Sequence, residues 1–426
     1  MLTLAEISEA TRGKLITGRP QQMVGAVSTD TRAIAPGSLF VPLVGERYDG
    51  HEFVATAIAQ GATAVLLGKE LSVATSCAVV AVENTLLAYG RLAHYWRSKL
   101  GLPVIAVTGS TGKTSTKETI YELLGRFLRC AKSQANFNNE IGVPRTLLEL
   151  RPGIQAAVVE FGMRGSGEIA YLTKLAQPDV GVITNIGSAH IGRLGSQAAI
   201  AAAKGELVQG MPDGRLVLNG DDPWCRELGR AHPRVCYFSL QGPAMGEVWA
   251  ASALEPVAAD GWSFRVSWCA NQQVAAASST IRLALPGRHH MANALAAIAV
   301  AWQLGIALPS ELTLAPLPVG GRNRVLAIGD IEIFDDSYNA NPDSARAALD
   351  TFCQLPCAGR RITVWSEMAE LGEYAAQAHR TLGLQLDDLP IDLVVTVGEL
   401  AELIAMSSKK PSLRCPDNCA AVNALQ

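Results

Sequence analysis

The sequence predicts an α/β protein of three domains, with a central parallel sheet between two further α/β units. Three observations support this. The chain has 426 residues, more than one ordinary hydrophobic core contains. Short apolar runs of strand length alternate with amphipathic segments, as in parallel sheets covered by helices. A helical segment at 84–100 meets Gly101 and Pro103, which predict its end and place a domain boundary nearby.

The first domain is expected over residues 1–84, with strands in "GSLFVPLVG", "TAVLLG" and "AVVAVE" and a helix near 52–60. The central domain is expected over 85–313. Its strands "VIAVT", "AAVVEFG", "VGVITNIG" and "LVLNG" are continuously apolar, which predicts a parallel sheet covered on both faces. The third domain, 314–426, has strands in "IEIFDDSYNA", "RITVW" and "DLVVTVG", separated by helices.

Two segments are candidates for a membrane span and for a signal peptide. Residues 291–308 are apolar, but their length is only about the minimum for crossing a bilayer and they contain Asn293 and Gln303. They predict a buried helix. The N-terminus carries Glu6 and Glu9 where a signal peptide needs a basic end and an apolar core. We therefore expect a cytoplasmic protein without membrane insertion.

Composition excludes several classes. Hydrophobic residues make up 49% and charged residues 18% of the chain, which is typical of a folded globular protein. The net charge of -3 gives no reason to expect nucleic acid, which usually requires a basic patch. The nine cysteines are scattered, and the pairs Cys353/Cys357 and Cys415/Cys419 have no histidine at zinc-like spacing. Free thiols in a reducing compartment are expected.

The segment "IAVTGSTGKTST" has the pattern of a phosphate-binding loop between a strand and a helix. A full Walker A motif would begin with a glycine at 107, where this chain has Val107, so the loop is a shorter form. Its backbone N–H groups and the helix N-terminus would bind an anion. Lys113 would pair with the β- and γ-phosphates, and the Thr114 hydroxyl would bind Mg²⁺. The residues predicted to bind nucleotide here are Thr108, Gly109, Ser110, Thr111, Gly112, Lys113 and Thr114.

Two neighbouring strands end in further polar groups. "AAVVEFG" ends with Glu160, and His190 follows "VGVITNIG". Carboxyl ends of parallel strands gather ligands, so both side chains are expected on the side of the phosphate loop. A solvated strand end for Glu160 and a hydrogen-bonded turn residue for His190 are the alternatives. Lys204, in an alanine-rich helix, would by default be a surface lysine.

The order of "TGSTGKT", "NFNNEIGVP", the Glu160 strand, "TNIGSAHIG", "LPGRHHMANALAA" and "DDSYNANPDS" resembles the Mur ligases, the ATP-dependent amide ligases of peptidoglycan synthesis. The resemblance covers nearly the whole chain and is most specific in "DDSYNANPDS". The D-N-P-R motif of the sister ligase that adds the third stem residue is absent. Folylpolyglutamate synthetases share the architecture but lack the "DDSYNAN" block.

The resemblance implies a P-loop ATPase-like central domain and a Rossmann-like C-terminal domain. It also implies a reaction. ATP, with Mg²⁺, phosphorylates the terminal carboxylate of UDP-N-acetylmuramoyl-tripeptide, and the amine of D-alanyl-D-alanine attacks the acyl phosphate. A carboxylate at neutral pH is a poor electrophile, so phosphorylation supplies its leaving group. Negative charge develops on the phosphoryl group and on the tetrahedral carbon, where Lys113 and backbone donors would stabilise it. A monomer is expected.

The same resemblance assigns roles to individual residues. Glu160 and His190 are implied metal ligands beside Thr114. The implied catalytic residues are Lys113, His190, Lys204 and Arg322. Lys204 matches a lysine that several Mur ligases carry as a carbamate. Arg322 is expected at the ATP phosphates, with Asn293 and Asp336 on the nucleotide. The implied substrate-binding residues are Ser28, Thr31, Arg32, Arg47, Asp49, His51, Asn136, Asn138, Asn139, Tyr338, Asn339 and Asn341.

The chain departs from the family pattern in three places. His290 stands where the family has asparagine, on the adenine side. Ser366 and Glu367 replace a Gly-Asp pair. Relatives continue beyond the equivalent of "NCAAVNALQ" with a strand and a Lys-Gly-Ser-Arg-like segment, so either more chain follows or a sheet edge is exposed.

Two rival functions remain open at this stage. One is an amide ligase of the same architecture with another substrate, such as a folate or an amino-acid polymer. The other is an impaired homologue that binds nucleotide without turnover. A P-loop motor or kinase would leave three polar clusters unused.

Overall fold

The computed structural model describes residues 2–69, 77–243, 245–250, 255–256, 261–268, 277–315 and 320–426. These fall into two compact units. The first contains residues 1–106, 128–163 and 168–179, and the second contains 107–127, 164–167 and 180–426. Strand β8, Val104–Thr108, begins in the first unit and ends in the second. The domain boundaries expected from the sequence stay a prediction.

The first unit begins with a five-stranded sheet in the order β2-β7-β6-β5-β4. Its strands β4, β5, β6 and β7 run parallel, and β2 pairs antiparallel with β7. The strands are β2 Lys14–Thr17, β4 Ala26–Ser28, β5 Ser38–Phe40, β6 Ala62–Leu67 and β7 Ala78–Ala81. The segments β1 Leu2–Thr3 and β3 Met23–Val24 form a separate antiparallel pair. The predicted strands of this region are confirmed.

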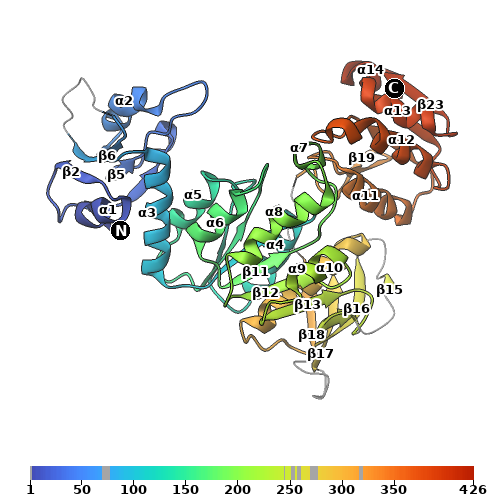
Figure 1. Ribbon diagram of the computed structural model, residues 1–426. Helices are drawn as coiled ribbons and strands as arrows, with labels where there is room; N and C mark the ends of the chain where they lie inside the picture. Colours follow the sequence, from blue (N-terminus) through green and yellow to red (C-terminus); the bar gives the residue numbers. More distant parts are fainter. Residues whose placement is uncertain are drawn as a thin grey trace. The chain divides into compact units, whose positions relative to one another are not determined.

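Helix α3, Thr85–Leu100, is the long helix of the first unit (Figure 1). Asn84 caps its start by accepting the Leu87 N–H, and Gly101 ends it at φ +63°. The predicted helix and its stop are therefore confirmed. It packs against α1 Leu4–Thr11, α5 Gly142–Glu149 and α6 Glu168–Ala176. Helix α2 is Val54–Ala59, and the parallel pair β9 Cys130–Lys132 and β10 Ala156–Glu160 completes the unit.

The second unit contains a long mixed sheet in the order β18-β17-β16-β14-β13-β12-β11. Its strands are β11 Val180–Ile183, β12 Arg215–Asn219, β13 Val235–Ser239, β14 Val248–Ala250, β16 Trp262–Trp268, β17 Ala277–Leu283 and β18 Glu311–Leu314, with β15 Glu255–Pro256 beside β16. Strands β11 to β14 are parallel. The predicted strands "VGVITNIG" and "LVLNG" are β11 and β12, and their parallel pairing is confirmed. Strand β16 pairs antiparallel with both β14 and β17, which the sequence analysis did not predict. Eight residues separate β16 from β17, too few for the crossover that parallel strands require.

Helices α4 Lys113–Leu124 and α10 Arg288–Gln303 pack together in the second unit. Most residues of α10 are buried, so the apolar stretch predicted as a buried helix is confirmed over that range. Among the described residues, no helix is long and apolar enough to span a bilayer. The unit also contains the helices α7 Ile191–Leu194, α8 Gln197–Gln209 and α9 Pro223–Gly229.

The C-terminal part of the second unit has its own parallel sheet, β21-β22-β23, formed by Ile362–Trp365, Leu393–Val397 and Ser412–Cys415. Its helices are α11 Pro342–Gln354, α12 Ala375–Leu386, α13 Glu399–Ser407 and α14 Asn418–Leu425. Leu349, Leu382, Val394 and Ile404 belong to one buried core between helices and sheet. The predicted strand in "IEIFDDSYNA" is β20, Ile331–Asp335, which pairs antiparallel with β19, Arg324–Ile328.

Candidate active site

The phosphate loop connects β8 to α4 and depends on two glycines with positive φ. Gly109 has φ +147° and Gly112, at the start of α4, has φ +75°. A side chain at position 109 would be blocked, because its Cβ would lie 1.9 Å from the Thr184 hydroxyl oxygen. The loop therefore lies in backbone contact with the segment that follows β11. Such a loop before a helix N-terminus exposes N–H groups to an anion.

Residues 184–185 hold the phosphate loop in shape. The Ser110 N–H donates to the Asn185 backbone oxygen at 2.9 Å, and the Thr111 N–H donates to Asn185 Oδ1 at 3.0 Å. The Thr184 hydroxyl donates to the Thr111 backbone oxygen at 2.6 Å, and the Thr184 N–H donates to Thr108 at 3.0 Å. Sequence reasoning missed Thr184 and Asn185. Their position inside "TNIGSAHIG", next to His190, was the available signal.

Lys113 and Ser110 are the polar side chains of the loop itself. Lys113 Nζ donates to the backbone oxygens of Gly109 at 3.0 Å and Ser110 at 3.3 Å. The Ser110 hydroxyl is buried and has no hydrogen-bond partner within the described part of the chain. Thr114, in the first turn of α4, is 4% exposed. The loop thus holds an ammonium group and two buried hydroxyls at a helix N-terminus.

Helix α10 contacts this helix start through Asn293. The Thr116 hydroxyl donates to Asn293 Oδ1 at 2.9 Å, and Asn293 Nδ2 lies 3.4 Å from His290 Nδ1. His290 is buried and its Nε2 has no partner among the described residues. Burial, with the adjacent His289 ring, holds the pKa of His290 well below its usual range. The residue that departs from the family pattern is therefore a neutral imidazole next to Asn293.

His190 follows β11 and adopts φ +67°, a left-handed conformation uncommon outside glycine. Its Nδ1 lies 2.6 Å from Glu370 Oε2, a contact that is an ion pair only when the imidazole is protonated. Burial lowers the pKa of His190, although the Glu370 charge opposes this. Glu370, also at positive φ (+64°), was not predicted.

Lys204 of α8 is 1% exposed, so the default expectation of a surface lysine is wrong. Burial, with a smaller contribution from the charge on Lys113, holds the pKa of Lys204 well below its usual range. Burial therefore favours the neutral amine form of Lys204 over the ammonium form.

Glu160, at the end of β10 in the first unit, is 2% exposed, so it is not a solvated strand end. Its Oε1 accepts the Asn138 Nδ2–H at 3.0 Å. Asn139 uses its Oδ1 to accept the N–H groups of Ile141 and Gly142, which turns the chain into α5. The Asn136 backbone oxygen accepts the Asn138 N–H at 2.8 Å. The side chain of Asn138, one of the predicted asparagines, thus contacts Glu160 directly.

A compact polar group precedes helix α11 in the second unit. The Asn323 N–H and side-chain amide donate to Asp336 Oδ1 at 3.1 and 2.8 Å. Arg322 lies over the Tyr338 ring, with its Cζ 4.3 Å from the ring centroid. Burial raises the pKa of Asp336 to about 6. The structure therefore brings three predicted residues, Arg322, Asp336 and Tyr338, into one cluster.

Asn341 has a structural role. It caps α11, because its Oδ1 accepts the N–H groups of Asp343 and Ser344 at 3.1 and 2.9 Å. Asn339 is exposed. Ser366 and Glu367, which replace the family's Gly-Asp pair, follow β21 and are exposed. The next residue, Met368, is buried and donates its N–H to His379 Nε2.

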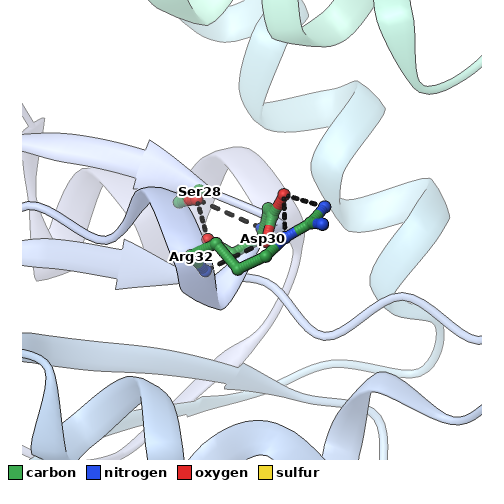
Figure 2. A network of polar contacts seen from close by, with 3 residues as sticks. All are labelled: Ser28, Asp30 and Arg32. Carbon is green, nitrogen blue, oxygen red and sulfur yellow. Dashed lines mark hydrogen bonds and ion pairs between the residues drawn. The ribbon is translucent and has the colours of Figure 1, made fainter.

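In the first unit the predicted substrate residues form two groups. Figure 2 shows the first, in which Asp30 connects Ser28 and Arg32. Arg32 Nη2 lies 2.7 Å from Asp30 Oδ2, and this pairing lowers the pKa of Asp30. Thr31 begins the short 3₁₀ helix between them. Arg32 is largely exposed, so its guanidinium faces solvent.

The second group surrounds His51. Its Nε2 accepts the Gly68 N–H at 3.1 Å, and its Nδ1 lies 2.7 Å from Asp49 Oδ1. Lys69 Nζ lies 2.6 Å from Asp49 Oδ2 and is the main reason that the pKa of Asp49 is lowered. Arg47 is exposed. His51 and Asp49 thus stabilise the local chain, with both ring nitrogens of His51 in use.

The site residues divide between the two units. The phosphate loop, His190, Lys204, Asn293 and the Arg322 cluster belong to the second unit, and Glu160 with the first-domain groups belongs to the first.

Three family models match the chain in succession. They are the Mur ligase family, catalytic domain, at residues 24–96; the Mur ligase middle domain at 107–301; and the Mur ligase, glutamate ligase domain, at 321–426. The α/β fold and its mixed central sheet therefore have the three-domain architecture of this family.

Named relatives agree over most of the chain. A UDP-N-acetylmuramoyl-tripeptide–D-alanyl-D-alanine ligase of Synechocystis is 39% identical over 376 residues, which cover 87% of this chain and 78% of the relative. A crystal structure of MurF from Acinetobacter baumannii has TM-score 0.88 at 33% identity and covers 100% of this chain and 91% of its own. The MurF ligase of Thermotoga maritima in complex with ADP has TM-score 0.82 at 28% identity, with coverages of 94% and 90%. The order of polar motifs, the glycine loop and these matches together place the chain in the Mur ligase family.

Proposed function

We propose that this protein is an ATP-dependent ligase that joins D-alanyl-D-alanine to the terminal carboxylate of UDP-N-acetylmuramoyl-tripeptide through an acyl phosphate. The observation that carries the proposal is the phosphate loop. Hydrogen bonds to Thr184 and Asn185 fix its conformation, and Lys113 lies at the start of α4. The names of the relatives supply the substrate class.

The loop suits transfer of a phosphoryl group. Lys113 Nζ now bonds the loop carbonyls of Gly109 and Ser110, and it would turn to phosphate oxygens when ATP binds. The Ser110 hydroxyl, which has no hydrogen-bond partner among the described residues, is a further donor within the loop. Positive charge and fixed N–H groups stabilise negative charge as it develops in the transition state. Attack by the dipeptide amine then releases phosphate and forms the amide bond.

The side chains assigned to Mg²⁺ are chemically suitable. Thr114 offers a hydroxyl oxygen and Glu160 a carboxylate oxygen, both buried, and Mg²⁺ prefers oxygen ligands. Asn138 donates to Glu160 Oε1 and so helps to orient the carboxylate. His190 has its Nδ1 against Glu370, which leaves Nε2 for a ligand. When bound, the ion supplies charge neutralisation for the phosphates.

Lys204 supports a carbamate in this proposal. Reaction with carbon dioxide requires a neutral amine, and burial favours that form by lowering the pKa of Lys204. The added anion would lie near Lys113, whose charge acts on Lys204.

The remaining groups would bind the ends of the substrates. Arg322 and Asp336 would contact the nucleotide, and Tyr338 and Asn339 the incoming dipeptide. Arg32, exposed beside Ser28 and Thr31, would contact the diphosphate, with Arg47. The protein would act as a monomer with domains at 1–84, 85–313 and 314–426.

One assay tests the function. Phosphate release from ATP is measured with UDP-N-acetylmuramoyl-tripeptide, with and without D-alanyl-D-alanine. We expect release that depends on the dipeptide, and loss of release in Lys113→Ala. Release driven by glutamate would identify the related amino-acid ligase instead, and no release with either amine would identify an impaired homologue.

A further inference from the structure

The segment after β11 contacts the C-terminal part of the second unit at several points. We name residues 187–195, "GSAHIGRLG", the docking loop. Asp343 Oδ2, from the first turn of α11, accepts both the Ser188 N–H at 2.8 Å and the Ser188 hydroxyl at 2.9 Å. Hydrogen bonds to a carboxylate are about twice as strong as neutral ones. One oxygen atom of Asp343 therefore holds the start of the docking loop.

Three further contacts hold the rest of this loop. The Gly192 N–H donates to the Glu370 backbone oxygen at 3.2 Å, and the Tyr374 hydroxyl donates to the Gly195 backbone oxygen at 2.8 Å. The backbones meet directly at Gly192, where an added Cβ would lie 2.4 Å from the Gly372 nitrogen. The docking loop is thus attached along its length.

The Asp343 contact also reaches the phosphate loop. An added Cβ at Gly187 would lie 2.2 Å from Asp343 Oδ2 and 3.4 Å from Ser110 Cβ. The Gly187 backbone therefore lies close to both the Asp343 carboxylate and the phosphate loop. Two residues earlier, Asn185 accepts the N–H groups of Ser110 and Thr111. A shift of residues 187–188 would be transmitted to both.

We propose that Asp343 is a positioning residue that holds Gly187 and Ser188 against the phosphate loop. Docking of the C-terminal part, through α11, and the nucleotide-binding shape of the phosphate loop are then coupled. The effect on nucleotide rests on the proposed function. By linkage, docking and nucleotide binding then strengthen each other by the same factor, and loss of the Asp343 contact reduces that mutual effect.

The test compares Asp343→Ala with Asp350→Ala. Both remove one carboxylate from α11, but Asp350 is exposed near the other end of that helix. Hydrogen exchange of segments 107–116 and 185–195 is followed by mass spectrometry, and ADP affinity by calorimetry. We expect Asp343→Ala to accelerate exchange in both segments at least threefold and to raise the Kd for ADP at least threefold. Asp350→Ala should match the wild type.

A second pair of variants tests the same contact without removing a carboxylate. Gly187→Ala and Gly359→Ala make the same substitution, neither at a positive φ, and only the first meets a neighbour within 4 Å. Gly187→Ala should reproduce both effects and Gly359→Ala neither.

The proposal is overturned if Asp343→Ala equals Asp350→Ala in exchange and affinity. It is also overturned if exchange rises in 185–195 alone while ADP affinity is unchanged, because the coupling is then absent. A wild-type protein without dipeptide-dependent phosphate release would refute the proposed function, and the exchange comparison would still decide the role of Asp343.

Discussion

Replacing Gly109 by alanine tests the geometry of the phosphate loop. The backbone at 109 has φ +147°, which residues with a side chain rarely adopt. The new Cβ would lie 1.9 Å from Thr184 Oγ1, the hydroxyl that donates to the Thr111 backbone oxygen at 2.6 Å. Thr184 must therefore move and give up that hydrogen bond.

The magnitude follows from these two effects. A residue held in an unfavourable φ/ψ region costs about 1–3 kcal/mol. A lost hydrogen bond of this kind adds about 1 kcal/mol. Together they disfavour the present loop conformation by about 2–4 kcal/mol. If that conformation is the one that binds nucleotide, the Kd for ADP should rise by about 30-fold to 700-fold, at about 1.4 kcal/mol per tenfold.

Calorimetric titration with ADP measures this effect directly. Thr184→Ala removes the hydroxyl alone and should raise the Kd about fivefold, from about 1 kcal/mol. In the double variant Gly109→Ala/Thr184→Ala the steric clash between the two side chains is absent. The loss of ADP affinity should therefore be smaller than the sum of the losses in the two single variants. Binding of ADP by Gly109→Ala within twofold of the wild type would refute the reasoning.

Three further predictions concern buried or paired groups. Burial raises the pKa of Asp336 to about 6 from an ordinary value of 3.8, so the folded state binds the proton more tightly. The free energy of unfolding should therefore fall as pH rises from about 4 to about 6, and Asp336→Asn should flatten that slope in urea titrations; equal slopes would contradict it. Burial lowers the pKa of Lys204, so its contribution to stability falls as pH drops below about 10.5. In carbonate-free buffer Lys204→Met should thus melt at a higher temperature than the wild type at pH 7, with a smaller gain near pH 10; a lower melting temperature at pH 7 would argue against a buried unmodified amine. His51→Ala leaves the Gly68 N–H without its acceptor and should cost about 1–3 kcal/mol in urea unfolding. The exposed Arg47→Ala is its control, expected within about 0.5 kcal/mol of the wild type, and similar losses in both would remove the structural role of His51.

Local patterns predicted the elements better than their pairing. The apolar run before Thr108 and the glycines after it predicted β8, the turn and α4, because strand, turn and helix start depend on adjacent residues. The antiparallel pairing of β16 with β17 was missed, since runs of similar composition fit either direction and pairing is a non-local choice.

The roles of individual side chains were likewise harder to predict than the motifs that contain them. Asn341 and His51 belong to quoted motifs, yet their side chains cap a helix and hold a loop amide. Thr184, Asn185 and Asp343 were not selected, because a threonine, an asparagine or an aspartate acquires such a role only from its partner in space. Lys204 looked like a surface lysine until packing around α8 enclosed it.

The sequence by itself determined the α/β class, the order of the motifs and the chemistry that the glycine turn and Lys113 can perform, because these depend on residue type and short spacing. Only the tertiary structure decided which groups meet: Asn185 with the phosphate loop, Asp343 with Ser188, Glu370 with His190. Contacts between residues more than 150 positions apart, as for Ser188 and Asp343, are set by packing of whole elements, which no local pattern encodes.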